Sequence, residues 1–236
     1  MKKQSDDNSE YSGLDELLNL EVMKNYNYFI VSMAMKYASR SKTIIDFGAG
    51  IGTLSRIIRD RFKIEPICVE IDKTNKGYLK KRGFVLNHGL STLENKVDLI
   101  FSSNVLEHIE DDLLVLRDMK TQLVEGGRIF LYLPAKMFLW SELDEKVGHY
   151  RRYEYNELKE KCKQVGLTIE RLHFADSLGF FASLVLKIFG FDKDGGLGSV
   201  SSLQFYDKWL MPMSIFLDIF GFKYLFGKNF ILVARK

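Results

Sequence analysis

The chain has 236 residues, of which 46% are hydrophobic and 28% are charged. These values are typical of a folded globular protein and argue against an intrinsically disordered chain. The formal net charge of +3 is too small to indicate a nucleic-acid-binding surface, so no nucleic-acid partner is expected.

Cysteine usage and apolar segments predict a cytoplasmic protein. Cys68 and Cys162 lie far apart and match no metal or redox spacing, which suits a reducing compartment. No secretory leader is recognisable. The most apolar segments, 178–191 and 209–222, each contain a charged residue and are shorter than the roughly 18–20 apolar residues of a bilayer span. We therefore expect no transmembrane helix.

Strands and helices alternate along the chain. Apolar residues recur at helical intervals from Leu14 to about Ala38, which predicts one or two helices. In chain order there follow a strand at 43–47, a helix at 53–62, a strand at 65–71, a helix at 74–83, strands at 84–89 and 97–104, a helix at 106–123, a strand at 128–134, a helix at 156–166, and strands at 167–174 and 229–236. This alternation indicates an α/β fold with a doubly wound, mostly parallel sheet. No linker divides residues 1–236, so one domain is expected, with a mobile loop over 191–202.

Three glycines follow the first strand in the stretch "IIDFGAGIG", residues 44–52. At this point of a doubly wound sheet the loop faces the ligand crevice, and glycines let the backbone approach a ligand closely. A dinucleotide fingerprint would need a glycine where Thr53 stands, which argues against a nicotinamide oxidoreductase. Glu70 ends the second strand about twenty residues later, where a carboxylate can accept ribose hydroxyls.

At these residues the chain resembles the class I S-adenosylmethionine-dependent methyltransferases. The resemblance covers residues 24–236 and rests on "IIDFGAGIG", "VEID", "VDLIFSSNVLEHIEDD" and "LVEGGRIFLYLP". It implies a Rossmann-like sheet of seven strands whose last strand inserts antiparallel beside the fifth. It also implies that S-adenosylmethionine is the cofactor and S-adenosylhomocysteine the product.

Carried over to this sequence, the resemblance implies a set of cofactor contacts. Most come from the two strand ends and the third and fourth loops, and two come from a helical lid over residues 1–40. The methionine part would meet Asp46, Gly48, Ala49, Gly50, Gly52, Asn104 and Val105; the ribose would meet Glu70, the adenine Ile71 and Leu90, and the lid would add Tyr26 and Asn27. Leu90 stands in for the acid that many relatives place after the third strand.

The acceptor is expected at the loop 136–153, after the fifth strand. This loop resembles a D-x-x-x-G-H-x-R-R-Y signature in a bacterial, type 11/12-like subset of the family. His149 is the natural general base because imidazole titrates near neutral pH. Asp144 is a candidate to orient His149 or an arginine, and His108 either to move a proton or to orient the loop by hydrogen bonds. Arg151 and Arg152 are candidates to clamp a phosphate or carboxylate, and Tyr153 and Trp140 to contact the acceptor. The alternative for the Arg-Arg-Tyr stretch is that it packs against and caps the next helix. No metal site is expected.

An apolar, aromatic-rich insertion, residues 176–226, precedes the last strand. It either covers one face of the sheet or provides a hydrophobic acceptor channel or a peripheral membrane contact through 178–222. The leading hypothesis is O-methylation of a small-molecule, glycan or lipid-linked acceptor at the inner face of the membrane. The alternatives are methylation of a quinone-like ring and a non-catalytic protein that binds S-adenosylmethionine.

Overall fold

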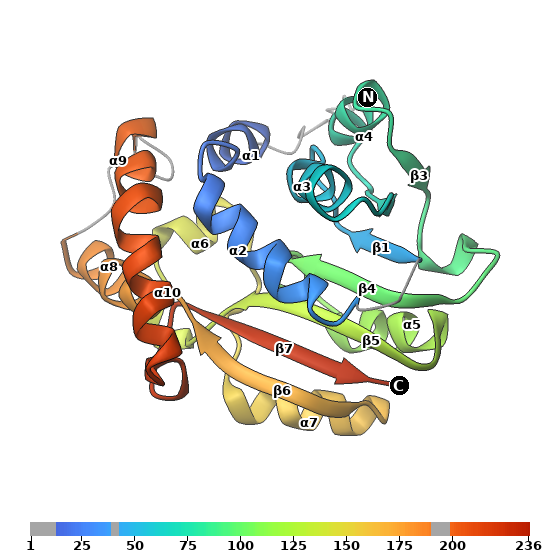
Figure 1. Cartoon of the computed structure of the whole chain (residues 1–236). Helices are drawn as coiled ribbons and strands as arrows, with labels where there is room; N and C mark the ends of the chain where they lie inside the picture. Colours follow the sequence, from blue (N-terminus) through green and yellow to red (C-terminus); the bar gives the residue numbers. More distant parts are fainter. Residues whose placement is uncertain (1–12, 39–42, 190–198) are drawn as a thin grey trace, which may run out of the picture.

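The computed structural model of the chain describes residues 13–38, 43–189 and 199–236. Its strands form one seven-stranded sheet in the order β3-β2-β1-β4-β5-β7-β6 (Figure 1). They are β1 (Ile44–Phe47), β2 (Ile67–Val69), β3 (Val85–Asn87), β4 (Val97–Ser103), β5 (Leu123–Pro134), β6 (Thr168–Ala175) and β7 (Asn229–Arg235). β7 lies antiparallel between β5 and β6, and the first five strands are parallel. The predicted doubly wound sheet and the antiparallel last strand are confirmed.

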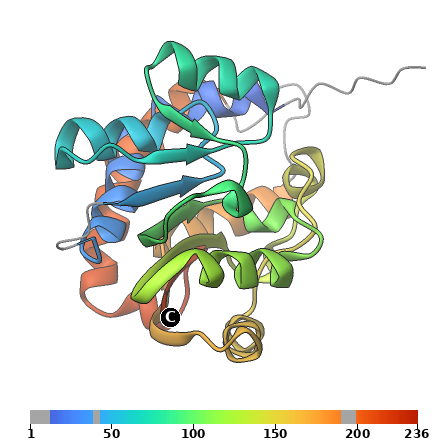
Figure 2. The same ribbon diagram turned by 90° about the vertical axis from the view of Figure 1, so that its right-hand side faces the viewer.

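Helices cover both faces of the sheet (Figures 1 and 2). α2 (Lys24–Met35) and α3 (Thr53–Phe62) share one core with Ile44, whereas α5 (Asp112–Gln122) and α7 (Tyr155–Val165) share the other with Ile45. Successive strand side chains point to opposite faces, so neighbouring residues of a buried strand enter different cores. The structure also contains α1 (Leu14–Leu20) and α4 (Lys73–Lys81), so each helix that the sequence predicts between residues 14 and 166 has a counterpart.

The helix predicted over 106–123 begins later than expected. Residues Leu106–His108 form a 3-10 turn, Ile109 is extended, and α5 begins only at Asp112. The side chain of Asp111 accepts a hydrogen bond from the Leu114 N–H at 3.0 Å and so caps the first turn. This cap fixes the helix start, because an aspartate before a helix satisfies an N–H that has no partner within it.

Two segments expected to be irregular contain helices. The acceptor loop holds a turn at Met137–Leu139 and α6 (Glu142–Lys146), which begins at a capping box formed by Ser141 and Asp144. Residues 191–198 of the predicted mobile loop lie outside the described residues. Its last three residues, 200–202, already belong to α9 (Val200–Phe205), so the prediction of a loop is wrong there.

The insertion before β7 is helical and lies at the end of the sheet where β4 and β5 finish (Figure 1). It consists of α8 (Ser177–Phe189), α9, a π-helical turn at Tyr206–Leu210 and α10 (Met211–Ile219). Within the described parts of the chain, no helix is both long and apolar enough to cross a bilayer.

Asp207 connects this insertion to α2, the helix that the sequence predicts to form part of a lid (hereafter the lid helix). Its two carboxylate oxygens accept the backbone N–H groups of Asn25 and Tyr26 at 3.0 and 2.8 Å. These N–H groups belong to the first turn of α2, whose own N-cap, Met23, provides no side-chain acceptor. A carboxylate 181 residues further along the chain therefore caps the lid helix.

We expect Asp207→Ala to lower the free energy of unfolding by about 1–3 kcal/mol, because the part-buried N–H of Asn25 and the buried N–H of Tyr26 lose a charged acceptor. Asp207→Asn, which keeps one acceptor oxygen, should lose less. Urea denaturation measures both, with the exposed Gln204→Ala on the same helix as control. Equal unfolding midpoints for Asp207→Ala and the control would contradict the capping role.

Candidate active site

The glycine loop joins β1 to α3 in a conformation that favours glycine. Gly48, Gly50 and Gly52 have φ values of 75°, 54° and 84°. At Gly48 there is also no room for a side chain, because a Cβ atom would lie 2.3 Å from Cγ2 of Val105. Glycine is therefore required at position 48 partly because the loops after β1 and β4 approach each other closely, and not only because a ligand can approach the backbone.

Glu70 lies next to this loop, at the end of β2, and is hydrogen-bonded to its backbone. Its Oε2 accepts the Gly50 N–H at 2.7 Å, and its Oε1 accepts the N–H groups of Ile71 and Asp72 at 2.7 and 2.9 Å. A carboxylate offers about four acceptor positions, so one remains, on Oε2. The Ile71 side chain beside it is 84% exposed.

Asp46 is buried beneath α3 and does not face the loop surface. Its Oδ2 accepts the Ser55 hydroxyl at 2.5 Å. Burial raises the pKa of Asp46 to about 7, against the effect of this hydrogen bond. In this position the Asp46 carboxylate holds the start of α3 to β1. To bind a ligand it would first have to break its hydrogen bond with Ser55.

The remaining cofactor candidates divide into two groups. Val105 and Asn104 follow β4 beside the glycine loop, and Asn104 has a left-handed backbone with φ 52°. The Tyr26 ring stands edge-on to Tyr132, with 5.9 Å between centroids, and burial raises the pKa of its hydroxyl. By contrast, the Asn27 amide donates to the Leu20 carbonyl at 2.8 Å and fixes the turn between α1 and α2. Leu90 lies in the buried core between the sheet and α5.

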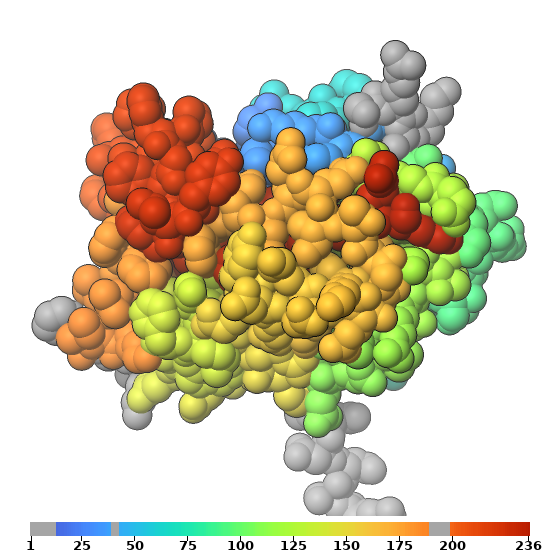
Figure 3. All heavy atoms as spheres, turned by 90° about the horizontal axis from the view of Figure 1, so that it is seen from below, coloured from blue at the N-terminus to red at the C-terminus, as the bar shows by residue number. Residues whose placement is uncertain are grey.

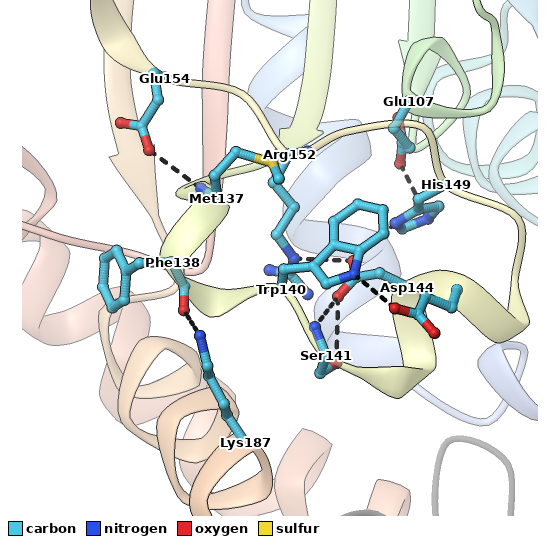
Figure 4. A network of polar contacts seen from close by, with 11 residues as sticks. Glu107, Met137, Phe138, Trp140, Ser141, Asp144, His149, Arg152, Glu154 and Lys187 are labelled. Carbon is cyan, nitrogen blue, oxygen red and sulfur yellow. Dashed lines mark hydrogen bonds and ion pairs between the residues drawn. The ribbon is translucent and has the colours of Figure 1, made fainter.

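Asp144 organises the acceptor loop (Figure 4). One of its oxygens meets Nδ1 of His149 and Nε of Arg152, each at 2.8 Å, and the other accepts the Ser141 N–H at 2.9 Å. Burial alone would raise the pKa of Asp144, but the His149 hydrogen bond and the Arg152 charge outweigh it and lower the pKa to about 2. Asp144 thus holds Nδ1 of His149 and leaves Nε2 without a hydrogen bond to this carboxylate.

The other side of His149 faces Glu107 and His108 (Figure 4 shows Glu107). Nε2 of His149 lies 3.9 Å from Oε1 of Glu107, and the His108 and His149 rings meet edge to face at 4.6 Å. Burial raises the pKa of Glu107 to about 8; burial, followed by the charge of His149, lowers the pKa of His108 to about 4. Glu107 has no predicted role, because a single glutamate in "LEHIEDD" has no local signal that distinguishes it from a surface acid.

Arg151 and Tyr153 bind the start of α5 and do not point freely toward an acceptor. Nη1 of Arg151 lies 2.9 Å from Oδ2 of Asp112, and the buried Tyr153 hydroxyl donates to the same oxygen at 2.7 Å. Both therefore anchor the acceptor loop in this structure. Arg152 is also buried, with Nη1 lacking a hydrogen-bond partner among the described residues. The Trp140 indole donates to Glu145 at 3.3 Å.

The strand order and the glycine loop define the Rossmann-like fold of the class I methyltransferases. Comparison with sequence families agrees: the family model described as "Methyltransferase domain" matches residues 21–172. The chain belongs to this family, which confirms the expected enzyme class and its cofactor, S-adenosylmethionine. No curated protein matches the sequence.

Solved structures show the same fold at low sequence identity. A chain from the complex between the Haloferax volcanii Trm112 methyltransferase activator and a methyltransferase has 14% identity and a TM-score of 0.60, over 96% of this chain and 97% of that one. A SAM-dependent methyltransferase from Archaeoglobus fulgidus has 15% identity and a TM-score of 0.59, over 94% and 99%. The plantazolicin methyltransferase BamL, solved with S-adenosylhomocysteine, has 13% identity and a TM-score of 0.57, over 95% and 87%.

The Gly48–Val105 contact can be tested by matched glycine substitutions. Gly83 has a similar φ of 76°, but a Cβ atom added there would meet no atom within 4 Å, so Gly83→Ala isolates the backbone cost, about 1–2 kcal/mol. Gly48→Ala should cost about 2 kcal/mol more because its methyl group meets Val105. In a Val105→Ala background most of this excess should disappear, because the two methyl groups at 2.3 and 2.7 Å are gone and only the Cβ of residue 105, at 3.0 Å, remains. Equal losses for the two single variants in denaturant titrations would refute the contact.

Proposed function

We propose that the chain transfers a methyl group from S-adenosylmethionine to an oxygen of a small-molecule, glycan or lipid-linked acceptor. The observation that carries the cofactor half is the hydrogen bond of 2.7 Å between Gly50 and Glu70. It places a carboxylate with a free acceptor position directly beside a loop that has no side chains. Ribose hydroxyls are donors that match this position, and the exposed Ile71 next to it offers an apolar face to adenine.

The methionine part would then extend along Ala49 and Gly50 toward Asn104 and Val105, under the lid that carries Tyr26. Binding both ribose hydroxyls would require one of the three hydrogen bonds of Glu70 to open, because they occupy all but one of its acceptor positions. The hydrogen bond from the Gly50 N–H is the one expected to open, because the cofactor would lie against this loop.

On the acceptor side, we propose that His149 takes the proton of a hydroxyl at Nε2 while Asp144 holds Nδ1. The oxygen then forms a bond to the methyl carbon, the carbon–sulfur bond breaks, and S-adenosylhomocysteine leaves. The buried Arg152, with its free Nη1, suits a phosphate or carboxylate of the acceptor. The stretch "LQFYDKWLMP", residues 203–212, resembles the same segment in the type 11/12-like bacterial subset, whose members often accompany glycosyltransferases, and this favours a glycan or lipid-linked acceptor. Methylation of a quinone-like ring is the alternative.

Two variants test the two halves of this proposal. Glu70→Ala should weaken S-adenosylhomocysteine binding at least about tenfold in calorimetry, because the ribose loses its acceptor and the glycine loop its anchor. The exposed Glu65→Gln on the approach to β2 is the control. Titration with a nicotinamide dinucleotide in parallel should give no binding.

His149→Ala should bind the cofactor normally but lose methyl transfer by about 100-fold or more. The assay supplies methyl-labelled cofactor to a cell extract and follows label into lipid, glycan, protein and nucleic-acid fractions. Binding without any labelled product would favour a non-catalytic protein, and transfer that survives His149→Ala would remove the proposed base.

We also propose that the insertion contacts an anionic membrane surface. Support comes from a helical stripe of exposed apolar side chains along α9 and α10: Phe205, Trp209, Met213, Phe216 and Phe220, each 56–69% exposed. Their spacing of three or four residues places them on one side of the helix. α8 lies against α10 and adds exposed Phe181, Val185 and Ile188 (Figure 3 shows both helices at one end of the molecule).

The charges of this insertion suit anionic lipid. Asp207 and Asp218 are both buried and turned into the protein, whereas Lys208 is exposed beside Trp209. An aromatic stripe edged by lysine, without an exposed acid on the same helix, is the pattern of a helix that lies in a membrane interface.

Trp209→Ser with Phe216→Ser should abolish flotation with phosphatidylglycerol vesicles, because the two largest apolar contacts are lost. Tyr28→Ser, an equally exposed aromatic on α2, is the control. Neutral phosphatidylcholine vesicles should bind less. No binding of the natural protein to either vesicle, or a stable dimer in ultracentrifugation that the double variant dissociates, would contradict the membrane contact.

A further inference from the structure

Three potential metal ligands converge where β4 and β5 end. Glu107 and His108 lie on the turn after β4, and His149 comes from the loop after β5. One ligand atom from each residue lies within 4.8 Å of the other two. β4 and β5 are adjacent and parallel, so their following loops meet at the same edge of the sheet even though the two histidines are 41 residues apart.

Glu107 is the unexplained member of this group. Its side chain is fully buried, and neither carboxylate oxygen has a hydrogen-bond partner among the described residues. Nε2 of His149, at 3.9 Å, is too far for a hydrogen bond. A buried carboxyl group without a hydrogen-bond partner either stays protonated or, to ionise, needs a cation or hydrogen bonds that compensate its charge.

We propose that Glu107, His108 and His149 form a binding site for a first-row divalent metal ion, such as Zn²⁺ or Co²⁺. Three atoms within 4.8 Å of one another all lie within about 2.8 Å of a common point, so shifts of under about 1 Å reach metal–ligand bonds of about 2.0–2.2 Å. Two imidazoles and one carboxylate favour such an ion over Mg²⁺ or Ca²⁺, which prefer oxygen ligands.

The surroundings of the histidines support ligation. Asp144 holds Nδ1 of His149 at 2.8 Å, which leaves Nε2 directed toward Glu107. The His108 ring meets the His149 ring edge to face, with 4.6 Å between the centroids. In most metal-binding histidines one ring nitrogen binds the metal and a hydrogen bond at the other fixes the ring, as the bond to Asp144 does for His149.

The site deepens the proposed function and rests on it for its consequence. With three protein ligands, the ion would keep open positions for the hydroxyl oxygen of the acceptor. Coordination would lower the pKa of this hydroxyl, so that its proton passes to water. The oxygen would then attack the methyl carbon as before. In that state His149 is a ligand, so the ion and direct proton transfer to His149 are alternatives that one experiment separates.

The test is metal binding by the whole protein after dialysis against EDTA. Titration with Co²⁺, followed by visible absorption, and with Zn²⁺, followed by calorimetry, should each show one ion per chain. Glu107→Gln, His108→Asn and His149→Ala should each weaken binding at least about 100-fold. Glu110→Gln and His88→Asn, which change the same residue types at exposed positions, should bind normally.

The outcome does not depend on whether a variant folds. If the natural protein binds neither ion stoichiometrically at about 100 μM, or if the exposed controls lose binding equally, the site is refuted. Methyl transfer that persists in EDTA with no ion bound refutes the role of the ion in activating the acceptor and leaves the proposed function standing. Conversely, stoichiometric ion binding without cofactor binding supports the metal site and removes the proposed function.

Discussion

The contact between Gly48 and Val105 sets the distance between the two halves of the site. Because residue 48 has no side chain, the loop after β1 approaches the loop after β4 until the valine methyl groups would touch a Cβ atom. Most of the residues proposed to bind the cofactor lie on the first loop and its neighbour β2. Glu107, whose Oε1 lies 3.9 Å from Nε2 of the proposed base His149, comes two positions beyond Val105. A larger residue at position 48 would separate these loops and so displace both sets of groups.

Buried carboxylates hold the loops around this contact. Asp144 orders the acceptor loop, Asp112 anchors it to α5, and Asp207 caps the lid helix from the opposite end of the chain. Breaking a buried charged pair costs roughly 3–5 kcal/mol, so Asp144, paired with Arg152, and Asp112, paired with Arg151, each fix one arrangement of the loop 136–153. Glu107 differs from them because neither of its carboxylate oxygens has a hydrogen-bond partner among the described residues, which is why we propose it as a metal ligand.

The sequence predicts the sheet well and the side-chain directions poorly. Strand and helix periodicity, together with the glycine spacing, predict the seven strands and the crossover helices. The start of α5 is missed because the left-handed Asn104 and the cap at Asp111 interrupt an apolar pattern that continues through both. Asp46, Arg151 and Tyr153 have the residue types of a site. Their partners Ser55 and Asp112 are set by tertiary packing, which no local pattern encodes.

The same limit explains why Glu107 cannot be predicted from the sequence while the two histidines beside it can. Imidazole attracts a functional interpretation because it titrates near neutral pH, whereas a glutamate acquires a role only through what surrounds it. In the folded chain, Asp144 fixes one nitrogen of His149 and thereby determines what the other can do. Toward solvent that nitrogen would serve as a base; toward a buried carboxylate and a second imidazole it completes a ligand set. The direction that Asp144 imposes on His149, more than the presence of an imidazole, therefore decides whether the proposed site suits proton transfer or metal binding.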